Sequence, residues 1–128
     1  ICAGMQILAG MFGAKLTSDI AKYSSSNMNH LDAVPAEESA HLVTGDSGSL
    51  LARISGVEEM QLNSRHKEGV VEVSDEVIVS GKAEDGIIEA IEIAGNEFVI
   101  GVQWHPEFFI EEGNPNFELF KALVKAAN

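Results

Sequence analysis

Gly101-Val102-Gln103-Trp104-His105-Pro106-Glu107 is the stretch that decides how this 128-residue chain is organised. It sets a histidine and a glutamate two positions apart, at the point where the apolar segment 98–104 stops. An almost wholly apolar run of this length predicts a strand that is buried on both faces. Pro106 stiffens the link between the two polar residues. We therefore interpret His105 as a candidate general base and Glu107 as the carboxylate that orients its ring.

The first residues of the chain supply a candidate nucleophile. Ile1-Cys2-Ala3-Gly4-Met5-Gln6 sets the only cysteine on a tight turn from a strand into a helix. A helix N-terminus and a neighbouring histidine both favour the thiolate, so we expect a lowered thiol pKa. The backbone N–H of Ala3 is placed to supply an oxyanion donor. A lone cysteine is usually a buried structural residue, but a thiol, an imidazole and a carboxylate together suit acyl transfer through a thioester.

Composition limits the partners and the compartment. The length fits one compact domain, residues 1–128. Twenty acidic residues against eight basic ones give a formal charge of −12, which argues against nucleic acid or an anionic membrane surface as a partner. The uncharged stretch 1–14 is too short to span a bilayer and lacks the basic start of a signal peptide. We therefore expect a cytoplasmic protein with no cofactor and no metal, since no ligand cluster or phosphate loop stands out.

Periodicity and turn residues predict the elements between the two motifs. The helix that follows Cys2 should run to about Leu16, and the polar stretch 17–39 should be a loop that covers an active site. Residues 87–93 alternate apolar and acidic side chains, as a half-exposed strand would, after a hairpin turn at Asp85-Gly86. The other expected elements are strands at 41–43, 59–62, 70–73 and 77–79, a short helix at 49–54 capped by Ser47 or Ser49, and a closing amphipathic helix at 116–127.

Residues 1–6 and 101–107 closely resemble the class I glutamine amidotransferase-like superfamily. Asn63-Ser64-Arg65-His66 resembles the Asn-Ser-x-His segment of its γ-glutamyl hydrolase branch, which includes γ-glutamyl-γ-aminobutyrate hydrolase. Segments 41–51 and 85–92 also look like that branch, so the resemblance runs nearly end to end. It implies an α/β fold: the C-terminal half of a flavodoxin-like three-layer α/β/α domain, with a small antiparallel β meander.

The same resemblance implies roles for individual residues. Cys2 would be the nucleophile, His105 the base and acid, and Glu107 the orienting carboxylate of a hydrolase that cleaves a γ-glutamyl amide through a γ-glutamyl thioester. Gln6 and the segment Ser64 to His66 would line the pocket for this small-molecule substrate.

The sequence indicates no clear role for one arginine and two histidines. Arg65 stands where the branch more often has an apolar residue, and it either meets a substrate carboxylate or is a solvated surface residue. His30 is interpreted as a loop residue and His41 as a structural one.

Departures from the family leave three functions open. The resemblance covers only the C-terminal half of the family domain, without the glycine-rich loop that supplies a second oxyanion donor. Lys67 and Glu68 stand where the branch usually has a histidine and a glutamine.

The candidates are a stand-alone γ-glutamyl hydrolase, a glutaminase module that passes ammonia to a synthase partner, and an inactive C-terminal fragment. Asn63-Ser64-x-His66 favours the first, and the expected partner is the protein's own N-terminal half or a second copy.

Overall fold

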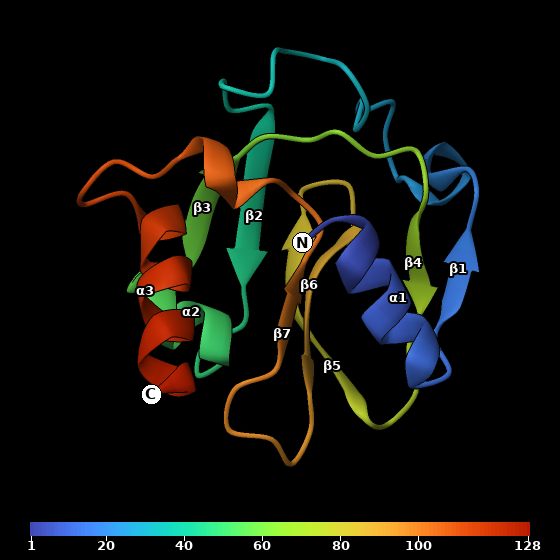
Figure 1. Cartoon of the computed structure of the whole chain (residues 1–128). Helices are drawn as coiled ribbons and strands as arrows, with labels where there is room; N and C mark the ends of the chain where they lie inside the picture. Colours follow the sequence, from blue (N-terminus) through green and yellow to red (C-terminus); the bar gives the residue numbers. More distant parts are fainter.

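The computed structural model describes residues 1–128 and is built around a five-stranded antiparallel sheet (Figure 1). The strand order is β3-β2-β5-β6-β7, so β7, which carries the start of the 101–107 motif, lies at an edge. The strands of this sheet are β2 (His41–Gly45), β3 (Glu59–Leu62), β5 (Val77–Ala83), β6 (Ile88–Ile93) and β7 (Ile100–Val102). A separate antiparallel pair joins β1 (Lys15–Thr17) to β4 (Gly69–Glu72).

Helices cover both faces of the sheet, which confirms the predicted α/β/α layering (Figure 1). α1 (Ala3–Met11) packs Met5 and Ala9 against a cluster that includes Ile91. α2 (Leu50–Ser55) and α3 (Pro115–Ala127) pack on the other face, where Leu51 and Leu119 join a cluster around the fully buried Trp104. None of these helices is both long enough and apolar enough to cross a membrane.

Local signals set the ends of the helices. The Ser49 side chain accepts a hydrogen bond from the backbone N–H of Ala52 at 3.1 Å and caps α2, as one of the two predicted caps. Asn114 caps α3 ahead of Pro115 at its first position. The predicted first helix is too long: it ends at Met11, because Gly13 turns the chain with a φ of 82°. Leu16 therefore lies in β1.

Two strand predictions need correction. The predicted strand 98–104 shortens to Ile100–Val102 at the sheet edge. β6 is buried along its whole length instead of being half-exposed, and its two acidic residues turn inward to polar partners. Glu92 accepts the backbone N–H of Leu51 at 2.9 Å at the start of α2. Burial raises the pKa of Glu89, but hydrogen bonds from His30 and His66 outweigh it and hold the pKa below its usual value.

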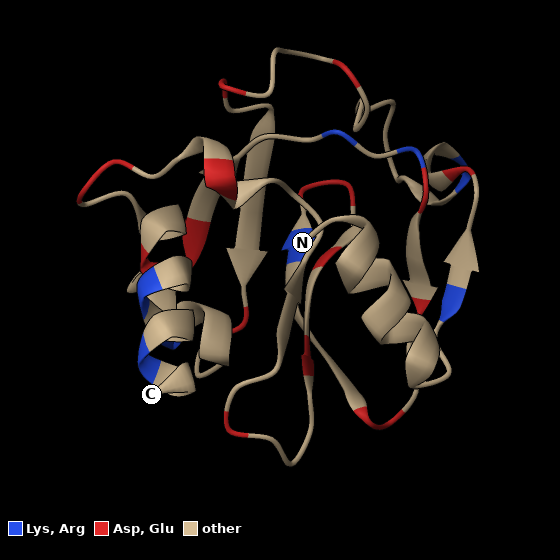
Figure 2. Ribbon diagram, viewed as in Figure 1, with Lys and Arg blue, Asp and Glu red and all other residues tan.

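Apolar surface stays uncovered on both sides of β7. On α1, Ile7 and Met11 are exposed, and on α3 the apolar residues Leu123 and Val124 are exposed as well. An apolar groove runs between β7 and α3 beside Ile1. Figure 2 shows the basic residues on separate elements, among them α3, β1 and the stretch between β3 and β4, while acidic residues lie along many loops.

Gly101 lets α1 lie close to β7, and this contact predicts a stability effect. A β-carbon added there would meet Cγ of Met5 at 2.9 Å and Cγ1 of Ile91 at 3.2 Å, both in the core. We expect Gly101→Ala to lower the free energy of unfolding by about 1–3 kcal/mol, measured by urea denaturation. The control is Gly4→Ala, where nothing lies within 4 Å of the added carbon, and it should be neutral or slightly stabilising. Equal stability of the two variants would contradict this packing argument.

Candidate active site

Cys2 sits on a strained elbow at the end of β7. It is the only non-glycine residue with positive φ, at 47° with a ψ of −111°. Its backbone N–H donates to the Val102 carbonyl at 2.8 Å, which fixes the start of α1 beside the end of the strand. Such a conformation costs about 1–3 kcal/mol and is typical of positions held for function, as in nucleophile elbows.

A glutamine that the sequence analysis did not single out contacts the thiol. The side-chain amide of Gln103 donates to Sγ of Cys2 at 3.5 Å, and its carbonyl oxygen accepts from the Gln6 amide at 3.1 Å. Gln6 also donates to the Glu68 carbonyl at 3.2 Å. Gln103 is fully buried, so this chain of amides holds its N–H toward the sulfur. The sequence feature that could have indicated this role is the position of Gln103 inside the 101–107 motif, directly after the strand.

The environment of Cys2 raises the thiol pKa instead of lowering it. Burial is the largest cause, and hydrogen bonds from the Ala3 backbone and from Gln103 oppose it without cancelling it. The negative charge of Glu107 also raises this pKa. The predicted low pKa is therefore wrong for this state of the protein, because the helix terminus does not offset the loss of solvent. Reaction of the thiol needs a base to remove its proton.

His105 and Glu107 form a hydrogen-bonded pair. The distance from Nδ1 of His105 to Oε1 of Glu107 is 2.6 Å. A carboxylate accepts the Nδ1–H, so Nε2 of the neutral ring carries the lone pair and can act as the base. Glu107 lies in the short 3₁₀ helix η2 (Pro106–Phe108), and the Phe108 ring meets the imidazole edge-on at 6.4 Å between centroids.

Asn63 holds the backbone of His105 from both sides. Its side-chain carbonyl accepts the His105 backbone N–H at 2.9 Å, and its amide donates to the His105 carbonyl at 3.0 Å. The same amide donates to the Ala36 carbonyl at 2.7 Å, which ties in the loop before β2. In the sequence Asn63 only indicates the family branch, whereas in the structure it positions the backbone of His105.

The other predicted pocket residues lie in different surroundings. Ser64 and His66 are buried, and they bond to interior partners: the Ser64 hydroxyl donates to the His30 carbonyl at 2.6 Å, and Nε2 of His66 lies 3.2 Å from Glu89. Arg65, between them, is half-buried and forms no ion pair with a carboxylate. Gln6 is the one member of the predicted set that is linked by hydrogen bonds, through Gln103, to Cys2.

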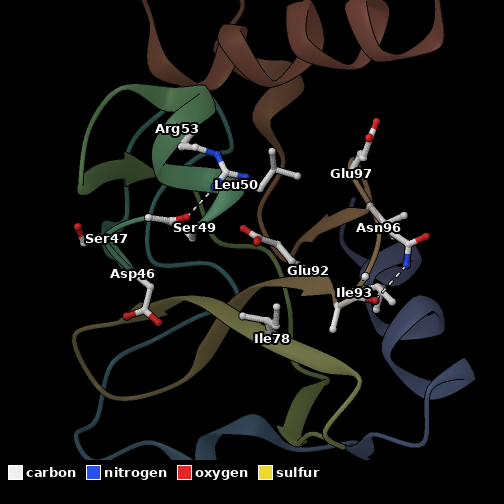
Figure 3. Close-up of a pocket in the computed structure, with 14 residues that line it drawn as sticks. Asp46, Ser47, Ser49, Leu50, Arg53, Ile78, Glu92, Ile93, Asn96 and Glu97 are labelled. Carbon is white, nitrogen blue, oxygen red and sulfur yellow. Dashed lines mark hydrogen bonds between the residues drawn. The ribbon is translucent and has the colours of Figure 1, made fainter.

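A separate hollow lies away from this chemistry. It has a volume of about 380 Å³, and its lining comes from the start of α2, from β6 and from the turn that precedes β7 (Figure 3). Arg53 and Glu92 are in the lining, but their polar groups already serve backbone atoms of Gly48 and Leu51. Neither Cys2 nor His105 lines it, so it adds nothing to the candidate site.

The contact between Gln103 and the thiol predicts a shift in Cys2 titration. Replacing Gln103 by Leu removes a hydrogen bond that favours the thiolate, so the Cys2 pKa should rise further. We expect the pH midpoint of iodoacetamide alkylation to move upward in Gln103→Leu. The matched control is Gln61→Leu on the exposed face of β3, which should leave the midpoint unchanged. An unchanged or lower midpoint in Gln103→Leu would contradict the assigned contact.

Comparison with known proteins identifies the family of this chain. Residues 1–107 match the family Peptidase C26. A glutamine amidotransferase-like protein of Rickettsia prowazekii is 41% identical over 78% of this chain and 36% of its own length. The γ-glutamyl-γ-aminobutyrate hydrolase of Escherichia coli is 30% identical over 98% of this chain and 52% of its own length.

Solved structures give the same fold. The chain aligns with a glutamine amidotransferase of Thermotoga maritima with a TM-score of 0.57 and 15% identity, over 98% of this chain and 54% of that one. The chain thus spans about a third to a half of the curated relatives it matches. It belongs to the peptidase C26 family and has the class I glutamine amidotransferase-like fold.

Proposed function

We propose that the complete protein hydrolyses γ-glutamyl amides, with Cys2 as its nucleophile. The observation that carries the proposal is the 2.6 Å hydrogen bond between His105 and Glu107, at the edge of the sheet where the strained Cys2 elbow begins α1. Membership of the peptidase C26 family supports a glutamine amidotransferase-like hydrolase. The γ-glutamyl specificity rests on the relative from E. coli and on Asn63-Ser64-Arg65-His66.

The proposed reaction has two halves. Nε2 of His105 takes the Cys2 proton while the sulfur attacks the γ-carbonyl carbon, and the same proton then goes to the departing amine. The backbone N–H of Ala3 stabilises the negative oxygen of the tetrahedral intermediate. His105 then deprotonates a water molecule, which attacks the carbonyl carbon of the γ-glutamyl thioester. The carbon–sulfur bond breaks, glutamate is released, and His105 returns the proton to the sulfur of Cys2.

The raised thiol pKa shapes this mechanism. Because burial disfavours the thiolate, Cys2 rests mainly as a neutral thiol and His105 must accept its proton as the substrate is attacked. The Glu107 carboxylate stabilises the imidazolium that results, through the hydrogen bond that it already makes. No cofactor takes part in these steps.

The substrate pocket is also a proposal. We assign direct contacts with the γ-glutamyl group to Gln6, which is linked to Gln103 beside the thiol, and to Arg65, whose free guanidinium suits the α-carboxylate. Ser64 and His66 are buried and bonded inward, so we propose that they shape the pocket by holding Arg65 between them.

The uncovered apolar groove beside β7 supports a partner for this surface. We propose that the protein's own N-terminal half or a second copy of the chain covers it and supplies a second oxyanion donor. The −12 formal charge supports a soluble protein that binds neither nucleic acid nor an anionic membrane surface, and we propose that it is cytoplasmic.

A substitution at Glu107 tests its orienting role. In the complete protein, Glu107→Gln should keep substrate affinity and lower the single-turnover acylation rate by about 10²–10⁴-fold, because the ring loses its fixed tautomer and its counter-charge. Rapid-quench kinetics measures this rate. Glu111→Gln, in the exposed loop that follows, is the control and should behave as the unaltered protein. Weaker binding with an unchanged acylation rate would move Glu107 into the substrate pocket.

Hydrolysis without a partner enzyme tests the reaction class. The complete protein alone should cleave a γ-glutamyl anilide and release glutamate, because a hydrolase needs no synthase partner to assemble its site. Cys2→Ala should abolish the release. Activity that appears only in the presence of a synthase would favour the glutaminase module instead.

A further inference from the structure

Three histidines surround one carboxylate in the interior, apart from the Cys2 elbow. Glu89 in β6 is fully buried, and its Oε1 lies 3.2 Å from Nδ1 of His30, 3.2 Å from Nε2 of His66 and 3.8 Å from Nε2 of His41. The three rings come from distant parts of the chain: the loop after η1 (Ile20–Tyr23), β2 and the segment after β3. All three histidines are buried.

The far nitrogen of each ring is held by an acceptor. Nδ1 of His41 lies 3.1 Å from the Leu42 carbonyl, and Nδ1 of His66 lies 2.8 Å from the Glu68 carbonyl. Nε2 of His30 lies 2.7 Å from Asp85, a buried carboxylate. Backbone carbonyls and carboxylates in these positions fix the tautomer and aim the other nitrogen, as they do for histidines that bind metals.

This arrangement leaves two polar atoms at the centre of the cluster without a partner. Nδ1 of His41 and Nδ1 of His66 each face a backbone carbonyl, so in both rings Nε2 is the atom that faces Glu89. Nε2 of His41 and Oε2 of Glu89 are buried without a hydrogen-bond partner. Asp85 and Glu89 are both buried, and a buried carboxylate costs free energy unless it is paired.

We infer that His30, His41 and Glu89 bind a divalent transition-metal ion, zinc in the first instance. Their ligand atoms lie within 4.8 Å of one another. Zinc–ligand bonds of about 2.0–2.1 Å in a tetrahedron set donors about 3.3 Å apart, close to the 3.2 Å and 3.8 Å that separate Oε1 of Glu89 from His30 and His41. The ion would offset the charge of the buried carboxylates and give Nε2 of His41 a partner.

All three donors are buried, so we assign the ion a structural role. It joins the loop that contains His30 to β2 and β6, and Glu89 of β6 also contacts the segment after β3 through His66. Asn63, which holds the His105 backbone, lies in that last segment. The inferred ion therefore acts on the fold and on the rigidity of His105, and its presence does not depend on the proposed γ-glutamyl chemistry.

Metal content and zinc affinity of the tag-free, complete protein test the inference. We expect about one zinc per chain by elemental analysis after dialysis, and a fall in Tm when a chelator removes it. Glu89→Gln and, in a second variant, His41→Gln should weaken zinc binding at least about 10–100-fold in chelator competition. Glu92→Gln changes a buried carboxylate of the same strand outside the cluster and should keep full affinity. Cys2→Ala should also keep it.

Each other result overturns the inference. A protein without stoichiometric zinc, with no gain in Tm on adding zinc, would mean that the cluster holds no metal ion. Loss of zinc in Cys2→Ala would place the ion on the thiol. Equal affinity of Glu89→Gln and Glu92→Gln would show binding elsewhere on the surface. Because His41→Gln retains the β6 carboxylate, it tests the site even where Glu89→Gln fails to fold.

Discussion

The hydrogen bond from the backbone N–H of Cys2 to the carbonyl of Val102, at 2.8 Å, is the constraint on which the candidate site depends. It joins the start of α1 to the end of β7, elements at opposite ends of the sequence. Gly101 permits the contact because α1 can then pack Met5 directly on the strand. Gln103, which follows the strand, donates a hydrogen bond to the thiol. This junction therefore places the Cys2 elbow beside the first part of the 101–107 motif.

A second constraint comes from buried charge. Glu89 costs free energy in the interior unless it is paired, and the histidines that pair with it draw the long loop before β2 and the segment after β3 against the sheet. In the same segment, the side chain of Asn63 forms two hydrogen bonds with the backbone of His105. The candidate base is therefore held from two directions: from β7 through the chain, and from β3 through a side-chain amide. This explains how a partly exposed imidazole keeps a fixed position at an edge of the sheet.

The sequence predicts local features well and long-range polar contacts poorly. The 101–107 motif, the Ser49 cap and the closing helix are readable because a few neighbouring residues determine each of them. Residues 87–93 were interpreted as half-exposed because acidic residues ordinarily face water, and only the three-dimensional fold reveals the partners of Glu89 and Glu92. His30 and His41 carry no local signal, since their common partner lies far away in sequence. The predicted direction of the Cys2 pKa shift is wrong for a related reason. Desolvation of the thiol depends on tertiary packing, which the spacing of residues in the sequence does not reveal.

The central claim is that Cys2 forms a covalent thioester whose formation depends on the His105–Glu107 pair. The most direct test is to mix the complete protein with a γ-glutamyl amide, quench within one turnover in acid, and locate any adduct by peptide mass spectrometry. We predict a γ-glutamyl group on Cys2, strongly reduced when His105 is replaced by Ala. An adduct on another residue, or substrate turnover by a Cys2→Ala variant at the unaltered rate, would contradict the account.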